Sequence, residues 1–178
     1  LTANSDLEAF WNESTPIMIN GVLFFSSQFN HVIAINAENG QSIWTFDPES
    51  YLAGTPPNHG FVHRGVAYWE KDNNKRIFVG TLDSFLYSID ACTGLLDVNF
   101  NNGGRVDLRE GLGRSINNDH YGVNSPPLVC KDTVVVGSSI MDYPAQYLNA
   151  TSMPPGDVRA FDAITGQLKW QFHVIPHE

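Results

Sequence analysis

Basic residues are scarce in this sequence. It contains 10 lysines and arginines against 19 aspartates and glutamates, which gives a formal net charge of -9. Binding to nucleic acid or to an anionic membrane surface needs a basic face, so this balance argues against both partners. There is also no apolar run long enough for a signal peptide or a membrane span, and we expect these residues to carry no targeting segment.

Cysteines are equally few. Cys92 and Cys130 are far apart, and neither has a second cysteine nearby, which excludes a zinc knuckle and a vicinal disulfide. A disulfide between the two remains open, and with it the redox compartment. Phosphate-binding loops, nucleophile elbows and His-Glu-x-x-His metal motifs are absent, so nothing supports a hydrolase or a kinase.

The sequence does contain an internal repeat. An eleven-residue pattern occurs at residues 34–44, 88–98 and 160–170. Each copy has an apolar strand end, an Asn or Asp, a turn that closes on Gly, and a short strand that reaches an aromatic or aliphatic residue. Gly is suited to a tight turn because it accepts a positive φ, while the Asn or Asp can accept hydrogen bonds from turn N–H groups. These turn residues are Asn36 with Gly40, Asp90 with Gly94, and Asp162 with Gly166.

Hairpin signals precede the repeats, so each unit is expected to contain three or four antiparallel strands. Asn20-Gly21 between two apolar runs is a strong two-residue hairpin signal, and Lys131-Asp132 separates another pair of runs. Repeated units of this kind predict an all-β propeller with blades of four antiparallel strands, because a sandwich would not repeat one turn three times.

The predicted blades lie approximately at residues 15–46, 65–100 and 124–173, in a single partial domain that spans residues 1–178. Known propellers have at least four blades, so about three blades cannot close a ring. Two sources of the missing blades remain open. They belong to a longer parent chain, or they come from other copies of a short chain that closes its ring by oligomerising.

Several motifs resemble those of the pyrroloquinoline-quinone (PQQ)-dependent dehydrogenases, particularly the glucose, polyol and quinate branch. The family's docking motif has the form Ala-x-Asp-x-x-Thr-Gly-x-x-x-Trp. Trp44 and Trp170 match its tryptophan, whereas Val98 departs from it and should loosen the second contact between blades. The segments Arg64–Trp69, Asn124–Leu128 and Val136–Ile140 are similar to further segments of the family, in the same order. The resemblance implies an eight-bladed propeller that binds PQQ with Ca²⁺ or Mg²⁺.

Three residues are the candidate cofactor contacts that this resemblance implies. Arg64 lies in the motif that the family places near the cofactor, and its guanidinium can pair a carboxylate through two hydrogen bonds. His59 lies five residues before it and corresponds to a family histidine found four residues before the arginine, although His63 competes for that role. Asp142 matches the acidic residue that follows the family's Gly-Ser segment. A surface salt bridge for Arg64 and a loop-capping role for Asp142 are the structural alternatives.

The resemblance also implies a function. The parent would oxidise a sugar, a polyol or another alcohol by hydride transfer to the quinone, with a quinone or a cytochrome as electron acceptor, in the periplasm or outside the cell. Any membrane attachment would lie outside this chain. The family's general base belongs to later blades, so we assign no catalytic residue and no metal ligand here and expect the chain alone to be inactive. The alternative is a non-catalytic propeller that acts as a protein-binding scaffold.

Overall fold

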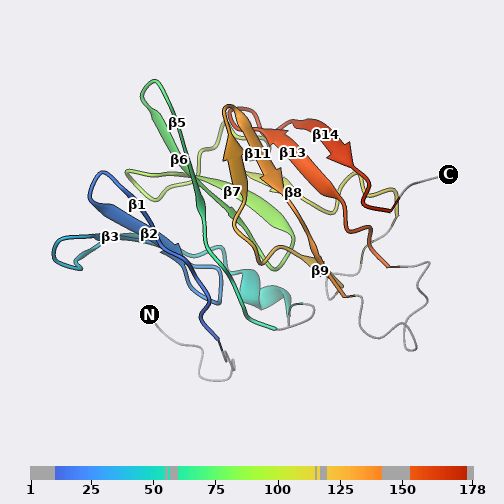
Figure 1. The fold of residues 1–178 in the computed structure, drawn as a ribbon, viewed down its shortest axis with the longest axis horizontal. Helices are drawn as coiled ribbons and strands as arrows, with labels where there is room; N and C mark the ends of the chain where they lie inside the picture. The colour runs from blue at the N-terminus through green and yellow to red at the C-terminus, as the bar shows by residue number, and fades with distance from the viewer. Residues whose placement is uncertain are drawn as a thin grey trace.

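The protein is built from antiparallel sheets that follow one another in chain order. The computed structural model describes residues 11–54, 56, 60–114, 116, 120–141 and 153–175. In this part of the chain, three sheets have four strands each and a fourth sheet has two. Figure 1 shows the sheets in chain order, from blue at the N-terminal side to orange and red at the C-terminal side. The prediction of four-stranded antiparallel blades is therefore confirmed.

We call the three four-stranded sheets blade 1, blade 2 and blade 3. Blade 1 contains β1 (Ile17–Ile19), β2 (Val22–Ser26), β3 (Val32–Asn36) and β4 (Ser42–Phe46). Blade 2 contains β5 (Ala67–Lys71), β6 (Asn74–Gly80), β7 (Phe85–Asp90) and β8 (Arg105–Asp107). Blade 3 contains β10 (Leu128–Cys130), β11 (Thr133–Val136), β13 (Val158–Asp162) and β14 (Leu168–Phe172). The remaining elements are the 3₁₀ helix η1 (Ser50–Ala53) and the pair β9 (Tyr121–Gly122) and β12 (Ser139–Ile140).

The repeated turn has the geometry that its residues predict. Gly40, Gly94 and Gly166 all have a positive φ, between 72° and 75°. In the second copy, the Asp90 carboxylate accepts hydrogen bonds from the backbone N–H and the hydroxyl of Thr93, at 2.8 and 2.9 Å. Asp162 does the same for Thr165 in the third copy. The repeat is thus a self-contained turn that each blade folds locally.

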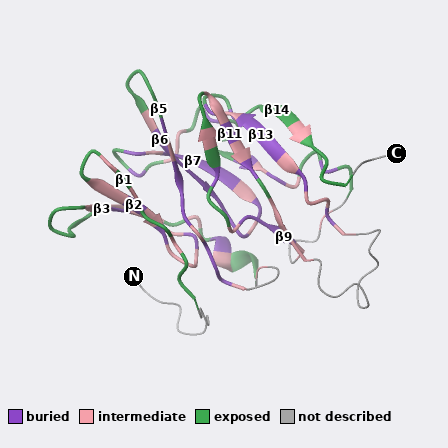
Figure 2. Cartoon of the chain, viewed as in Figure 1, coloured by how far each residue is buried: buried purple, intermediate pink, exposed green. Residues whose placement is uncertain are grey.

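The sheets stack face to face, with blade 2 in the middle. Along β6, Ile77 and Val79 pack with blade 1, whereas Phe78 between them packs with blade 3. This alternation follows from the two-residue period of a strand. Figure 2 shows buried residues concentrated on β6, β7, β11 and β13, while the turns are exposed. The core therefore consists of two apolar layers, one between each pair of neighbouring blades.

Trp44 joins blade 1 to blade 2. Its indole Nε1 donates a hydrogen bond to the Ala91 carbonyl oxygen at 3.1 Å. The ring lies so close to Gly94 that a Cβ on that glycine would fall 2.7 Å from the Trp44 Cδ2 atom. The absence of a side chain at Gly94 is thus needed both for the positive φ of the turn and for the approach of the indole.

The contact between blades 2 and 3 differs from the prediction. Residues 94–98 form no strand, Val98 is 69% exposed, and the fourth strand of blade 2 lies further on, at β8, beyond the predicted boundary near residue 100. Phe100 and Asn101 cover Gly166 instead, with a hydrogen bond of 2.9 Å from the Asn101 N–H to the Thr165 carbonyl oxygen.

Arg76 supplies the donor that a tryptophan supplies in the first contact. Its Nη1 donates to the carbonyl oxygens of Ala163 and Ile164, and Ala163 occupies the same place in its turn as Ala91. Asp97 pairs with the same guanidinium, which lies over the Trp69 ring at 5.2 Å. Val98 thus takes no part in the contact, and an arginine from a different strand supplies the hydrogen bond; whether the second contact is looser than the first stays a prediction.

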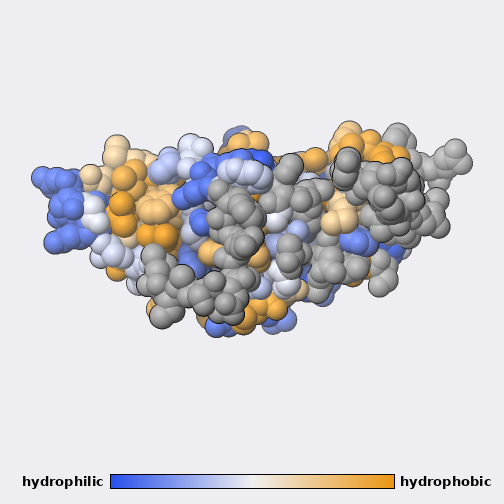
Figure 3. Space-filling view, turned by 90° about the horizontal axis from the view of Figure 1, so that it is seen from below, coloured by the Kyte–Doolittle hydropathy of each residue, from blue (hydrophilic) through white to orange (hydrophobic). Residues whose placement is uncertain are grey.

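Both outer faces of the stack remain partly open. At blade 1, Gly40 has no atom within 4 Å of the position that a Cβ would take. At blade 3, Trp170 is 45% exposed and Phe172 is 63% exposed. Figure 3 shows hydrophobic residues at the surface towards both ends of the molecule. Among the described residues, the glycine and tryptophan that make the first contact between blades thus recur at the two ends of the stack without a neighbouring blade docked on them.

Candidate functional site

The segments that lead into the first strand of each blade lie side by side. The Thr15 N–H donates to the Arg64 carbonyl oxygen at 3.0 Å, and the Arg64 N–H donates to the Asn124 carbonyl oxygen at 2.8 Å. Gly65 permits this approach, since a Cβ there would lie 3.0 Å from the Thr15 carbonyl oxygen. In a propeller the blades surround a central channel. We therefore take the side of the molecule on which these segments converge as the side that faces the channel.

Arg64 and Glu13 form an ion pair at this convergence. The Arg64 Nε atom lies 3.0 Å from the Glu13 Oε2 atom, with the two side chains 39% and 45% exposed. The pair joins the segment before β1 to the segment before β5. A half-exposed guanidinium held by one carboxylate can still present a planar, charged surface to an anionic ligand. The role of Arg64 in cofactor binding stays a prediction.

The other predicted cofactor contacts are not placed at this site. His59 and Asp142 lie outside the described residues. His63, which competed with His59 for the histidine role, is fully buried, so its ring does not reach the surface that Arg64 and Glu13 share. Burial lowers the pKa of His63 to about 4, with a further decrease from the Arg64 charge, against an opposing hydrogen bond to the Gly80 carbonyl. His63 is therefore neutral at pH 7.

Sequence reasoning missed Glu13. It belongs to the Asn12-Glu13-Ser14 stretch, which matches the N-glycosylation pattern and gave no functional signal of its own. A usable signal is position: Glu13 and Arg64 each lie a few residues before the first strand of a blade. Where such segments converge, charged residues from different blades meet.

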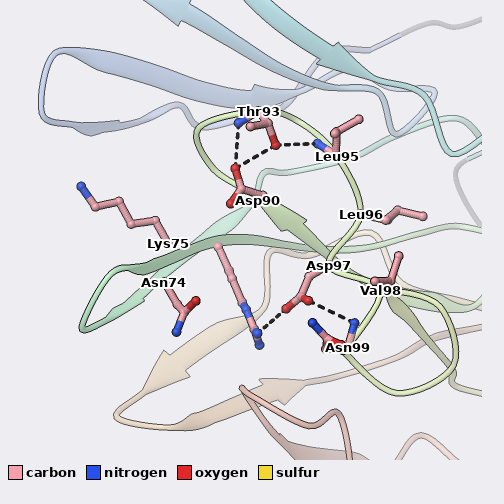
Figure 4. A pocket seen from close by; sticks show the side chains of 10 residues that line it. Asn74, Lys75, Asp90, Thr93, Leu95, Leu96, Asp97, Val98 and Asn99 are labelled. Carbon is pink, nitrogen blue, oxygen red and sulfur yellow. Dashed lines mark hydrogen bonds and ion pairs between the residues drawn. The ribbon is translucent and has the colours of Figure 1, made fainter.

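A pocket of about 290 Å³ lies at the opposite end of blade 2, beside the turns that follow β5 and β7. Figure 4 shows Asp90 bonded to Thr93 and Asp97 bonded to Asn99 across its lining. Arg76 is used by the contact with blade 3. Of the charged side chains that line the pocket, Asp90, Asp97 and Arg76 are thus committed to turns and to blade packing, and Lys75 pairs with Glu70 at 3.7 Å. This makes the pocket a poor candidate for a ligand site.

Two further features are absent from the described ranges. No group of three or more His, Cys, Asp or Glu side chains there could hold a metal ion. No helix in the same part of the chain has the length and apolar character that a membrane crossing requires.

Stacked four-stranded sheets, whose leading segments converge on one side, define a segment of a β-propeller. All residues, 1–178, match the family model described as "PQQ: Glucose/ethanol/alcohol dehydrogenase, beta-propeller domain". The chain belongs to this family of PQQ-dependent dehydrogenase propellers, which confirms the resemblance drawn from the motifs.

Individual relatives agree with the family. The quinate/shikimate dehydrogenase (quinone) of Acinetobacter baylyi is 29% identical over 183 residues, which cover 90% of this chain and 21% of that protein. The quinohemoprotein alcohol dehydrogenase of Comamonas testosteroni superposes with a TM-score of 0.70 at 27% identity, over 93% of this chain and 21% of that one. The enzyme ADHIIG of Pseudomonas putida gives a TM-score of 0.70 at 31% identity, over 94% and 21%. The chain thus spans about a fifth of the length of these relatives.

Proposed function

We propose that this chain supplies about three blades of a PQQ-dependent dehydrogenase that oxidises a sugar, a polyol or another alcohol. The observation that carries the proposal is the Arg64–Glu13 ion pair where the leading segments of the blades converge. Membership of the family supports the reaction class, and the named relatives include enzymes for quinate or shikimate and for alcohols. The remaining blades and the general base would belong to the rest of the parent protein.

The chemistry of Arg64 suits one end of the cofactor. PQQ is a planar tricarboxylate that accepts a hydride when bound, and its carboxylates need cationic partners. Arg64 would hold one carboxylate through charge-assisted hydrogen bonds, while Glu13 on the opposite edge would fix the plane of the guanidinium. His59 and Asp142 remain the other proposed contacts. A Ca²⁺ or Mg²⁺ ion would bind with the cofactor, through ligands that we do not assign.

The proposal extends to partners and location. The substrate would be a small alcohol or sugar, and the acceptor a quinone or a cytochrome, as the words "quinone" and "quinohemoprotein" in the relatives' names suggest. We propose a periplasmic or extracellular location, with any membrane attachment through segments outside these residues.

The test is equilibrium binding of PQQ to the intact polypeptide that carries these residues, in the presence of Ca²⁺, followed by quenching of tryptophan fluorescence. Arg64→Ala should raise Kd about ten- to hundredfold, because a charge-assisted hydrogen bond contributes roughly 1.5–3 kcal/mol. Arg105→Ala is the matched control: it removes one positive charge from β8, at the far edge of blade 2 from the converging segments. Failure of the unmodified polypeptide to bind PQQ would reject the dehydrogenase and favour the protein-binding scaffold.

A further inference from the structure

A chain of buried and partly buried hydrogen bonds joins residues next to Arg64 and Glu13. The His63 ring lies between blade 1 and blade 2, with Nδ1 2.6 Å from the Ser26 Oγ atom and Nε2 2.7 Å from the Gly80 carbonyl oxygen. The Ser26 Oγ atom lies 3.2 Å from the Ser14 Oγ atom. The Ser14 Oγ atom in turn accepts the Ser26 backbone N–H at 3.1 Å. His63 and Ser26 are both fully buried.

The chemistry of the partners gives this chain a single direction. A carbonyl oxygen can only accept, so His63 Nε2 carries the proton and donates it to Gly80. In a neutral imidazole Nδ1 then has no proton and accepts from the Ser26 hydroxyl. Having used its only proton, the Ser26 Oγ atom accepts from the Ser14 hydroxyl. Each side-chain donor from Ser14 to His63 is thus matched to one acceptor.

The two ends of the chain are the immediate neighbours of the ion pair. Ser14 follows Glu13, and His63 precedes Arg64. The hydrogen bond from the Thr15 N–H to the Arg64 carbonyl oxygen ties the same two segments through their backbones. A shift of the segment before β5 relative to the segment before β1 would therefore break both the buried chain and the ion pair.

We propose that His63, Ser26 and Ser14 are positioning residues that hold Glu13 and Arg64 in register for the cofactor. This inference rests on the proposed function for its ligand, but its geometry is a property of the chain itself. Buried, fully matched polar networks select one arrangement of the groups that they join. The fixed tautomer of His63 makes every hydrogen bond of the chain point the same way, from Ser14 and Ser26 at blade 1 towards Gly80 in blade 2.

The test removes one hydroxyl at a time from the intact polypeptide. Ser26→Ala removes the hydroxyl that links Ser14 to His63, and it takes away only one oxygen atom. Ser14→Ala removes the first hydroxyl of the chain and is the second variant in case Ser26→Ala folds poorly. Ser88→Ala is the matched control, because Ser88 is also fully buried and its Oγ atom has no hydrogen-bond partner within the described residues. Unfolding midpoints check that each variant is folded.

Two measurements separate positioning from a general loss of structure. In selectively ¹⁵N-labelled protein, the His63 Nδ1 atom should show the chemical shift of an unprotonated ring nitrogen, and the Arg64 Nε–H signal should be protected from exchange. Ser26→Ala should remove this protection while Ser88→Ala keeps it. The Kd for PQQ should rise about two- to tenfold in Ser26→Ala, as expected for one neutral hydrogen bond, and should not rise when Arg64→Ala is already present.

Each outcome has a separate meaning. Unchanged Arg64 Nε–H protection in both serine variants would overturn the positioning role, whatever PQQ does. An equal rise in Kd in the presence and absence of Arg64 would also overturn it, because the effect would then be general. If Arg64→Ala leaves the Kd unchanged, the proposed role of Arg64 in cofactor binding fails, and the NMR signals still decide whether the buried chain sets its position.

Discussion

Replacing Gly94 with alanine should reveal how strongly blade 1 is docked on blade 2. An alanine at φ +75° has an unfavourable backbone conformation that costs about 1–2 kcal/mol. Its Cβ would also lie 2.7–2.9 Å from three atoms of the Trp44 ring, well inside van der Waals contact. The indole must then move away and strain its hydrogen bond to Ala91, which adds about 1–3 kcal/mol. Gly94→Ala should therefore destabilise the protein by about 2–5 kcal/mol.

Gly40→Ala separates these two contributions. Gly40 has nearly the same φ, +72°, but no atom lies within 4 Å of its Cβ position, so only the backbone cost applies. Thermal unfolding of residues 1–178 should show a Tm lower by about 2–12 °C for Gly94→Ala than for Gly40→Ala, at roughly 2–4 °C per kcal/mol. In a Trp44→Ala background this excess should disappear. Equal effects of the two substitutions would refute the docking argument.

Three further predictions concern buried charge, pH and activity. Arg76→Met should destabilise the protein by about 3–5 kcal/mol in urea unfolding, because it leaves the Asp97 carboxylate without its cationic partner and the Ala163 carbonyl oxygen without its donor; a loss below 1 kcal/mol would contradict this role. Burial lowers the pKa of His63 to about 4, so as the pH falls the unfolded chain binds a proton at this residue before the folded chain does. Stability should be full above pH 6.5 and fall by on the order of 3 kcal/mol towards pH 4, a loss that His63→Gln should reduce. Residues 1–178 alone, given PQQ and Ca²⁺, should show no dye-linked oxidation of glucose, glycerol or quinate; turnover above a heat-denatured sample would contradict their incompleteness.

Much of the fold could be predicted because its key element is local. The turn around Gly94 is stabilised by Asp90 and Thr93, within a few residues, and the same holds for the turn around Gly166. Such turns can be identified in a sequence before any long-range contact is known. The repeated pattern then requires equal sheets, and equal sheets with one apolar face for each neighbour must stack.

The features that could not be predicted arise from contacts between residues that are far apart in the sequence. Val98 occupies the tryptophan position in the repeat, yet the chain leaves the sheet there, and Arg76 from β6 reaches the carbonyl oxygen instead. Glu13 and His63 gave no clear signal either, because their roles arise only when the segments before β1 and β5 come together. The bounds of the single partial domain, and the roles of His59 and Asp142, stay predictions.

The exchange of a tryptophan for an arginine at the second contact has a consequence for finding related proteins. What the two contacts share is an acceptor, the carbonyl oxygen after the Asp of the turn, and a bare glycine beside it. The donor differs in residue type and in strand. A search that demands the aromatic residue would overlook blades of this kind, so blade counts in divergent sequences are better anchored on the turn than on the side chain that docks against it.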